Sequence, residues 1–364
     1  MTHFIRHLLR RIADPIDPPL MALAAILLGI AVLVLGSASP ERIGSQCVNV
    51  FTALIIMRIA AQLPPQRLMY LALPTYVVGL TLLLAVMEFG EVSKGARRWL
   101  NLGVMRIQPS EIMKIAMPLM LAWYFHKRES LIRVRDHFVA AVLLIAPVAL
   151  IAQQPDLGTA ILVMAAGFFV IFFAGLPWKI ILGLVATVAA AAPLAWSVLH
   201  DYQRARILTL LDPEADPLGK GFHIIQSTIA IGSGGLFGKG WGQGTQAQLD
   251  FLPERHTDFI FAVISEEFGL LGNLVLLTVY ALLIGRGLMI AANAPTLFTR
   301  LLAGSITLIF FTYAFVNMGM VSGILPVVGV PLPFVSYGGT ALVTLFLGIG
   351  ILMSIHKHRM LVQT

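Results

Sequence analysis

The stretch GTAILVMAAGFFVIFFAG, Gly158 to Gly175, contains no charged residue and only one hydroxyl group. Leu20–Gly36 and Ala341–Ile355 are also free of charge over at least fifteen residues. A helix needs roughly 20 mostly apolar residues to cross about 30 Å of hydrocarbon, where the backbone must satisfy its own hydrogen bonds. These stretches therefore predict helices that cross a lipid bilayer.

The composition of the whole chain agrees with a membrane protein. Of its 364 residues, 58 % are hydrophobic and 12 % are charged, whereas about a quarter of a globular protein is charged. A soluble chain this apolar would expose large sticky patches. The single cysteine, Cys47, excludes an intrachain disulfide and a multi-cysteine metal site. The formal net charge of +7 is expected to reflect membrane topology, with no nucleic acid as partner.

Hydropathy divides the chain into about ten spans and predicts an all-α, polytopic membrane protein with a single domain over residues 1–364. Residues 1–19 and 356–364 form the termini, and residues 200–257 form one long loop. The expected spans are 20–36, 44–62, 71–88, 111–126, 138–153, 158–176, 179–199, 259–284, 301–324 and 339–355.

Lysines and arginines gather on one side of these spans, and the positive-inside rule makes that side the cytoplasm. Both termini are then cytoplasmic, and the loop 200–257 lies outside. The chain shows no repeated block of the kind that marks many transporters. The cytoplasmic side carries Arg6, Arg10, Arg11, Arg58, Arg67, Lys127, Arg128, Arg133, Arg135, Lys179, Arg286, Arg300, Lys357 and Arg359.

One short outer loop, between the third and fourth spans, breaks this charge rule. It carries Lys94, Arg97, Arg98 and Arg106. Either the span count is wrong by one, or the loop is a cationic site for an anionic ligand. The other short loops agree with the assigned orientation, which favours a site.

The densest polar cluster beside a span is FLPERHTDFIFAVISEEFG, Phe251 to Gly269. Asp258 in it either caps the eighth span or is a carboxylate at the membrane surface, able to act as a general base. Glu266 lies roughly 12 Å further along a continuous helix, beyond the ~5–9.5 Å that separates paired carboxylates in glycoside hydrolases. We therefore expect Asp258 to act without Glu266 or Glu267. Both glutamates must face protein, ions or a wet cavity.

Two more acidic positions fall on the same membrane face. Glu111 and Lys114 open the fourth span after Gln108, Pro109 and Ser110, and their spacing lets them pair on one helix face. Asp156 lies in the short outer turn before the sixth span. Each position is also explained as a capped helix start. Independent caps have no reason to accompany a basic loop, so their convergence favours one shared site.

Two glycine-rich stretches interrupt the pattern of spans. GSGGLFGKGWGQGTQ, Gly232 to Gln246, fails the Walker phosphate-loop pattern at two positions and is expected to be an irregular surface loop, with Lys239 and Trp241 able to meet headgroups. GILPVVGVPLPFVSYGG, Gly323 to Gly339, holds three prolines and four glycines, which a regular helix does not tolerate. Irregular backbone at membrane depth lines a cavity or is covered by protein, so this segment favours a ligand groove.

Several motifs together resemble the signature segments of the SEDS family (shape, elongation, division and sporulation). They are GARRWLNLG, QPSEIMK, QQPDLGTA, YQRARI with LDPEADPLGKGFH, QSTIAIGSGGLFGKG, GTQAQLDFLPERHTDFIFAVISEEFGLLG and GVPLPFVSYGG. The resemblance covers nearly the whole chain in the same order. Arg255 within FLPERHTDFIFAV and the ending MSIHKHRML are more similar to the family's elongation member than to its division member.

This resemblance implies a ten-span protein of the bacterial inner membrane, with both termini cytoplasmic and the active site facing the periplasm. It also implies a peptidoglycan glycosyltransferase that polymerises lipid II during cell elongation. The family's essential aspartate corresponds to Asp258, and Arg106, Glu111, Lys114 and Asp156 are similar to its other polar cavity positions. The implied partners are a class B penicillin-binding protein, which cross-links the new strands, and other membrane proteins of the elongation complex.

On this hypothesis, Asp258 takes the proton from the GlcNAc 4-hydroxyl of the acceptor lipid II, whose oxygen attacks the MurNAc anomeric carbon of the lipid-linked glycan chain. Arg97, Arg98, Arg106 or Lys114, or a divalent cation such as Mg²⁺ or Mn²⁺, stabilises the leaving undecaprenyl pyrophosphate. Two alternatives remain. A flippase or transporter for the same lipid needs no base at the outer interface, and a non-catalytic scaffold can dispense with the polar cavity.

Overall fold

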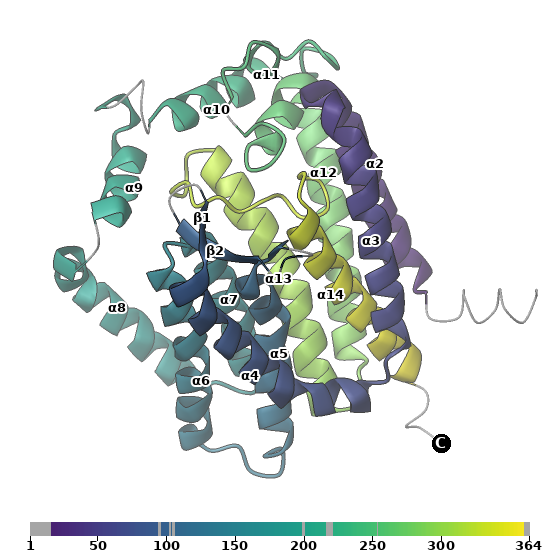
Figure 1. Ribbon diagram of the computed structural model, residues 1–364, viewed down its shortest axis with the longest axis vertical. Coiled ribbons are helices and arrows are strands. Elements are labelled where there is room, and N and C mark those ends of the chain that lie inside the picture. The colour runs from purple at the N-terminus through teal and green to yellow at the C-terminus, as the bar shows by residue number, and fades with distance from the viewer. Residues whose placement is uncertain are drawn as a thin grey trace, which may run out of the picture.

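The structure, a computed structural model, describes residues 16–93, 96–101, 103, 106–198, 201–215, 221–252 and 254–359. It is a bundle of long helices with a group of short helices at one end (Figure 1). Four of the basic residues singled out from the sequence lie outside the described residues: Arg6, Arg10, Arg11 and Lys94.

In the described part of the chain, a long helix coincides with each of the ten expected spans. These are α2 (Pro18–Ala38), α3 (Ile43–Gln62), α4 (Pro65–Phe89), α5 (Pro109–His126), α6 (Val134–Gln153), α7 (Leu157–Phe173), α8 (Trp178–Val198), α12 (Ile260–Ala292), α13 (Leu297–Val321) and α14 (Gly339–His358). Seven segments are long and apolar enough to cross a membrane: α2, α3 with the preceding 3-10 turn η1 (Pro40–Arg42), α4, α6, α12, α13 and α14. The all-α polytopic fold is confirmed, and the count of ten crossings stays a prediction.

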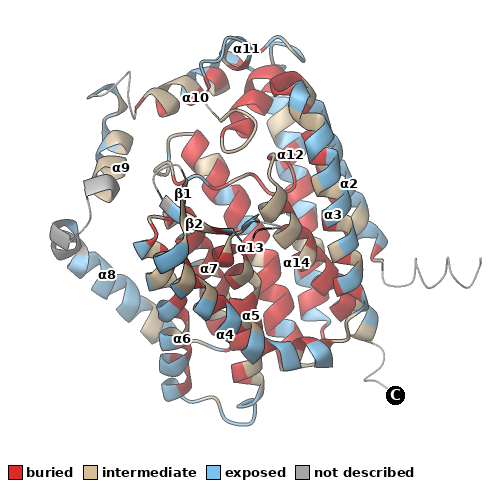
Figure 2. Ribbon diagram, viewed as in Figure 1, coloured by how far each residue is buried: buried red, intermediate tan, exposed pale blue. Residues whose placement is uncertain are grey.

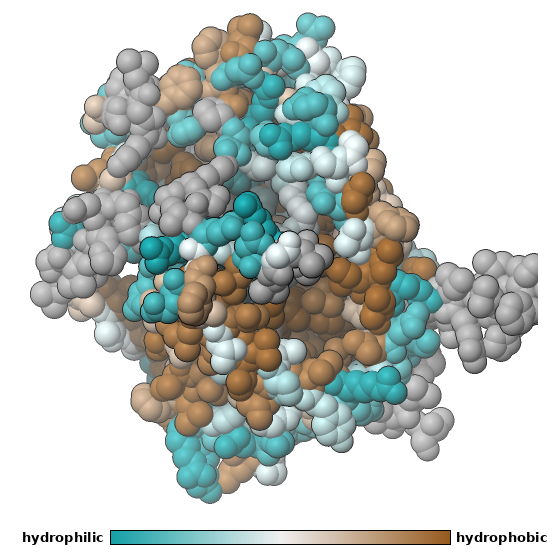
Figure 3. Space-filling view, viewed as in Figure 1, coloured by the Kyte–Doolittle hydropathy of each residue, from teal (hydrophilic) through white to brown (hydrophobic). Residues whose placement is uncertain are grey.

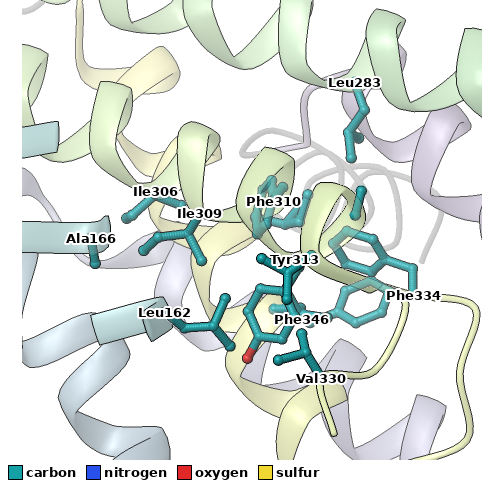
Figure 4. Close-up of a cluster of buried hydrophobic side chains, with 14 of the residues drawn as sticks. Leu162, Ala166, Leu283, Ile306, Ile309, Phe310, Tyr313, Val330, Phe334 and Phe346 are labelled. Carbon is teal, nitrogen blue, oxygen red and sulfur yellow. The ribbon is translucent and has the colours of Figure 1, made fainter. Parts of the chain in front are cut away.

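Helix α13 forms the centre of the bundle. Of its most apolar window 78 % is buried, against 22 % for the segment that contains α3, and Figure 2 shows the same contrast in colour. Phe310 of α13 packs edge-on against Phe334 with ring centroids 5.4 Å apart, and Phe334 packs against Phe346 of α14 at 5.3 Å (Figure 4). The irregular segment 322–338 is therefore anchored in the core.

The loop between α4 and α5 contains strands that the sequence analysis did not predict. Among the described residues, β1 (Glu91–Ser93), β2 (Ala96–Asn101) and β3 (Arg106–Ile107) form an antiparallel sheet in the order β1-β2-β3. Leu100 pairs with Ile107 and Asn101 with Arg106. The register shifts between Glu91 and Val92, which pair with Trp99 and Arg97, so Arg98 is an extra residue on β2 and the strand is bulged there.

The long segment 200–257 contains further helices rather than an extended linker. These are α9 (Asp201–Leu211), the 3-10 turn η2 (Pro213–Ala215), α10 (Phe222–Ser233) and the short α11 (Thr245–Gln248). Helices α10 and α11 lie over one end of the bundle, whereas α8 and α9 stand apart from its body (Figure 1).

A charged cluster marks the opposite end of the bundle. The Arg286 Nη2 atom lies 2.5 Å from Asp17 Oδ2, and the His356 Nε2 atom lies 3.4 Å from the same oxygen. Asp17 also caps α2, because its side chain accepts a hydrogen bond from the Leu20 N–H at 2.9 Å. The start of α2 and the end of α14 therefore meet at one end, and Asp258, which precedes α12, lies at the other.

Candidate functional site

Asp258 lies in a turn just before α12, at the end of the bundle that α10 and α11 cover. Phe259, one residue after Asp258, occupies the N-cap position of α12. The Asp258 backbone carbonyl accepts a hydrogen bond from the Asn317 side chain of α13 at 2.8 Å. The aspartate is thus held by the central helix of the bundle.

The segment 322–338 forms a cradle for the residues around Asp258. The Ser336 hydroxyl donates to the Thr257 carbonyl at 2.6 Å, and the Tyr337 N–H donates to the His256 carbonyl at 2.8 Å. The Asp258 carboxylate lies over Gly329, where an added Cβ would sit 3.3 Å from Oδ2. The segment borders the candidate base, and the ligand groove expected along it stays a prediction.

Burial lowers the pKa of His256, the neighbour of this aspartate, and the positive charge of Arg42 lowers it further. The imidazole stacks edge-on against Tyr337, with centroids 5.8 Å apart. With its pKa below the ordinary value, His256 stays neutral at neutral pH. It therefore adds no positive charge beside the carboxylate.

Lys114 and Glu111 form a buried pair at the start of α5. Lys114 Nζ lies 2.6 Å from Glu111 Oε1, and their side chains are 3 % and 11 % exposed. The pairing predicted from their spacing is confirmed. Lys114 also donates to the Tyr313 hydroxyl and lies 4.9 Å from the centroid of that ring. Figure 4 shows Tyr313 between Leu162 and Val330, at the edge of the apolar core.

Asp156 both caps a helix and joins the polar cluster. Its Oδ1 accepts the Thr159 N–H of α7 at 3.2 Å, as a cap does. Its Oδ2 accepts a hydrogen bond from Gln108 at 3.1 Å and lies 3.8 Å from Arg98 Nε. The two interpretations of Asp156 are therefore compatible.

Close backbone packing joins the surroundings of Asp156 and Asp258. A Cβ on Gly158 would lie 2.7 Å from the Val328 carbonyl oxygen, a distance that real side chains do not reach. The start of α7 thus lies directly against the segment that carries Gly329. Asp156, two residues before Gly158, and Asp258 therefore both lie near the backbone of Val328 and Gly329.

An apolar cavity of about 450 Å³ lies between α3, α4, α5 and α14. Arg106, Gln108 and Glu111 line one part of it, and Arg106 also pairs with Glu91 at 3.0 Å. Figure 3 shows a hydrophobic hollow on this face of the molecule, next to hydrophilic residues. The apolar lining includes Ile56, Ile112, Ile115, Leu119, Val343 and Leu347.

Arg97 is placed apart from these groups. Its Nη1 donates to the Met87 carbonyl at 3.3 Å from an exposed position. Arg98, its neighbour on β2, points instead to the Pro155 carbonyl, to which its Nη2 donates at 3.1 Å. Among the predicted cations, the structure brings Arg98, Arg106 and Lys114 to the polar cluster, whereas Arg97 contacts the Met87 carbonyl instead.

The two glutamates of α12 hold the glycine-rich loop. Glu266 Oε1 lies 2.7 Å from Lys239 Nζ and accepts the Gln246 N–H at 3.1 Å, and Glu267 accepts a hydrogen bond from Ser37. Both glutamates face protein, as expected, and neither partners Asp258 in these contacts. Lys239 pairs with Glu266, and the contact of Lys239 and Trp241 with headgroups stays a prediction.

The backbone of this loop enters a break in α12. Gly269 has φ 64° and ψ −157°, outside the helical region. The Lys239 and Gly240 N–H groups donate to the carbonyls of Glu266 and Glu267, at 2.9 and 3.0 Å. The loop is mostly exposed, as expected of a surface loop, and its hydrogen bonds also join it to α12.

Two site residues escaped the sequence analysis, Tyr313 and Asn317. They lie four positions apart on α13 and so share one helix face. Polar groups at that spacing in an otherwise apolar span are the signal that would have found them. Among the described residues, no group of three His, Cys, Asp or Glu side chains can hold a metal ion.

These features define a polytopic α-helical membrane protein in which Arg106 and Glu111, the partner of Lys114, line an apolar groove, and Asp258 lies toward the same end of the bundle. The family model described as "Cell cycle protein", of FtsW, RodA and SpoVE, matches residues 20–361. The chain belongs to this family, the SEDS family that its motifs resemble.

Named relatives span nearly its whole length. It is 55 % identical over 348 residues to "Peptidoglycan glycosyltransferase MrdB" of Escherichia coli (strain K12), covering 94 % of each chain. It is 38 % identical over 283 residues to "Stage V sporulation protein E" of Bacillus subtilis (strain 168), covering 77 % of this chain and 76 % of the relative.

Solved structures share the fold. A chain from "Structural coordination of polymerization and crosslinking by a peptidoglycan synthase complex" matches with a TM-score of 0.83 and 37 % identity, over 94 % of this chain and 98 % of that one. The rod shape determining protein RodA of Thermus thermophilus matches with a TM-score of 0.72 and 32 % identity, over 94 % and 97 %.

Proposed function

We propose that this chain is a peptidoglycan glycosyltransferase that polymerises lipid II into β-1,4-linked glycan and releases undecaprenyl pyrophosphate. The observation that carries the proposal is the apolar groove beside Arg106 and Glu111, together with the anchored carboxylate of Asp258 at the same end of the bundle. A lipid-linked sugar has an apolar tail, a pyrophosphate and a hydroxyl. An enzyme for such a substrate needs an apolar groove, cations and a base, which the groove, the basic residues beside it and Asp258 would supply.

Asp258 acts as the general base in this proposal. Its carboxylate takes the proton from the GlcNAc 4-hydroxyl, and the oxygen attacks the anomeric carbon of MurNAc on the lipid-linked chain. The bond from that carbon to the pyrophosphate oxygen breaks, and the pyrophosphate leaves with the electron pair. Attack from the opposite side inverts the carbon and gives the β-1,4 linkage.

Arg98, Arg106 and Lys114 stabilise the leaving pyrophosphate. Arginine suits phosphate because its planar guanidinium donates two parallel hydrogen bonds. Asp156 orients Arg98 from 3.8 Å, and Glu111 holds Lys114 in place at 2.6 Å. A role for Arg97 in binding the same group stays a prediction, since its guanidinium donates to the Met87 carbonyl and not to this cluster.

A divalent cation, Mg²⁺ or Mn²⁺, fits this site only as a companion of the substrate. Mg²⁺ typically binds through one or two carboxylates together with substrate phosphates and water. The described residues offer single carboxylates near the groove, Asp156 and Glu111, and no cage of three. When bound, the ion would neutralise charge on the leaving group.

The chain is proposed to lie in the bacterial inner membrane with both termini cytoplasmic and Asp258 facing the periplasm. The placement of Asp17 and His356 at one end, and Asp258 at the other, supports this orientation. We also propose that a class B penicillin-binding protein cross-links the new strands, within a larger set of elongation-complex membrane proteins. A relative solved within a peptidoglycan synthase complex supports such a partner.

The decisive experiment supplies labelled lipid II to the purified chain, together with a transpeptidase partner whose own active site is blocked. Asp258→Asn, which keeps the side-chain shape, is expected to abolish glycan polymer. Glu41→Gln, an exposed carboxylate 69 % accessible on the same end of the bundle, is the matched control and should polymerise normally. Polymer from Asp258→Asn at the unchanged rate contradicts the base assignment. Lipid II crossing liposomes without polymer from the unchanged chain supports a flippase instead.

A further inference from the structure

We infer that Asn317 is a positioning residue for Asp258: its side-chain amide fixes the backbone of the base to the segment that carries Gly329. This inference deepens the proposed function and rests on it. The amide donates one hydrogen bond to the Asp258 carbonyl at 2.8 Å and the other to the Val330 carbonyl at 2.7 Å. Both N–H groups of one side chain are thus used to join two segments that are far apart in the sequence.

Its place in the fold makes Asn317 a rigid support. The side chain is fully buried, at 0 % exposure, on the most buried of the candidate spans. Burying an amide group costs free energy unless it is hydrogen-bonded, and the two hydrogen bonds that Asn317 donates offset this cost. Its Oδ1 has no hydrogen-bond partner among the described residues, whereas both N–H groups do. The amide is therefore retained for its two donors.

The second side of the support is Gly329. Its φ of 73° is a conformation that side chains disfavour. A Cβ added there would lie 3.3 Å from Asp258 Oδ2, tighter than most real contacts. The carboxylate thus lies against the backbone of Gly329, and the Asn317 side chain links the backbone of Asp258 to that of Val330.

Holding a general base in place matters because proton transfer requires hydrogen-bond reach of the hydroxyl. A displacement of about 1 Å costs up to ~10²-fold in rate. A base that is free to shift by that amount still lets the lipid bind, because the groove and the cations lie elsewhere. The inference therefore predicts a loss of kcat with little change in KM.

A matched control separates positioning from simple stability. Ser305, also fully buried on α13, donates to the Ala166 carbonyl of α7 at 2.7 Å and touches neither strip of backbone around Asp258. Ser305→Ala removes one buried hydrogen bond between helices, as Asn317→Leu removes two. Both variants should lower the melting temperature of the purified complex, which the experiment measures in parallel.

The test measures kcat and KM for lipid II polymerisation in Asn317→Leu, Gly329→Ala and Ser305→Ala. The first two are expected to lose about 10- to 100-fold in kcat with KM within about twofold of the unchanged chain. Ser305→Ala should keep kcat. The inference is overturned if Asn317→Leu keeps kcat at temperatures where it is folded, if its loss matches that of Ser305→Ala, or if KM rises as much as kcat falls. Failure of the proposed function looks different, because the unchanged chain would then make no polymer, and failure of the base assignment would leave Asp258→Asn active.

Discussion

Breaking the Lys114–Glu111 pair provides the sharpest test of the site's electrostatics. Lys114→Met leaves a carboxylate without its cation, and Glu111→Gln leaves an ammonium without its anion. Removing one partner of a buried ion pair costs about 3–5 kcal/mol. The range applies because the lysine side chain is only 3 % exposed. Lys114→Met should lie at the lower end of this range, because the charge it leaves unpaired, Glu111, is 11 % exposed and lines the groove.

The double variant Glu111→Gln with Lys114→Met should recover most of this loss. Replacing a whole buried pair by neutral groups is often close to neutral, and the Tyr313 hydroxyl left without its donor costs about 1 kcal/mol. The expected cost of the double variant is therefore about 1 kcal/mol. The coupling between the two positions is then several kcal/mol.

The measurement is equilibrium unfolding in mixed micelles at increasing detergent denaturant, followed by the fluorescence of the five tryptophans. Polymerisation of lipid II is assayed on the same preparations. If Lys114 serves the pyrophosphate, the double variant is stable and inactive. Additive costs of the two single variants would refute the pairing, and a stable, fully active double variant would refute the role of Lys114.

Three further predictions concern the ends of the bundle, the groove and the metal. Burial alone would raise the pKa of Asp17, but the hydrogen bonds from Arg286 and the Leu20 N–H outweigh it and lower the pKa below 3.8. This carboxylate therefore stabilises the fold fully above that pH and loses its effect as pH falls through the lowered pKa. The melting curves of Asp17→Asn and of the unchanged chain should therefore converge in acid. Val343→Trp, which fills the groove from α14, should raise KM for lipid II with a full-length tail and spare a short-tailed analogue; equal effects on both would contradict a tail in the groove. Chelation of divalent cations should slow polymerisation but leave the melting temperature unchanged, since a drop would reveal a metal held by the fold itself.

Much of this architecture could be predicted from the sequence because a bilayer simplifies the problem. Hydropathy alone located the ten long helices, and the spacing of Glu111 and Lys114 predicted their contact, because both depend on local geometry. Asp156 could likewise be placed at a helix start.

What the sequence could not predict depends on contacts between distant segments. Asn317 reaches Asp258 across 59 positions, and no local pattern encodes that approach. The neighbours Arg97 and Arg98 have different partners on a strand of six residues whose pairing shifts at Arg98, and no local pattern reveals such a shift. The docking of the glycine-rich loop likewise required knowledge of the break at Gly269.

That break has a consequence for how the protein is made. Residues 235–240 leave the ribosome before α12, yet their backbone partners are the Glu266 and Glu267 carbonyls and the Leu270 and Leu271 N–H groups. The loop backbone lacks these hydrogen-bond partners until α12 has been made, and the backbone groups at the break in α12 lack theirs until the loop joins them. This part of the bundle is therefore completed only after α12 has been synthesised.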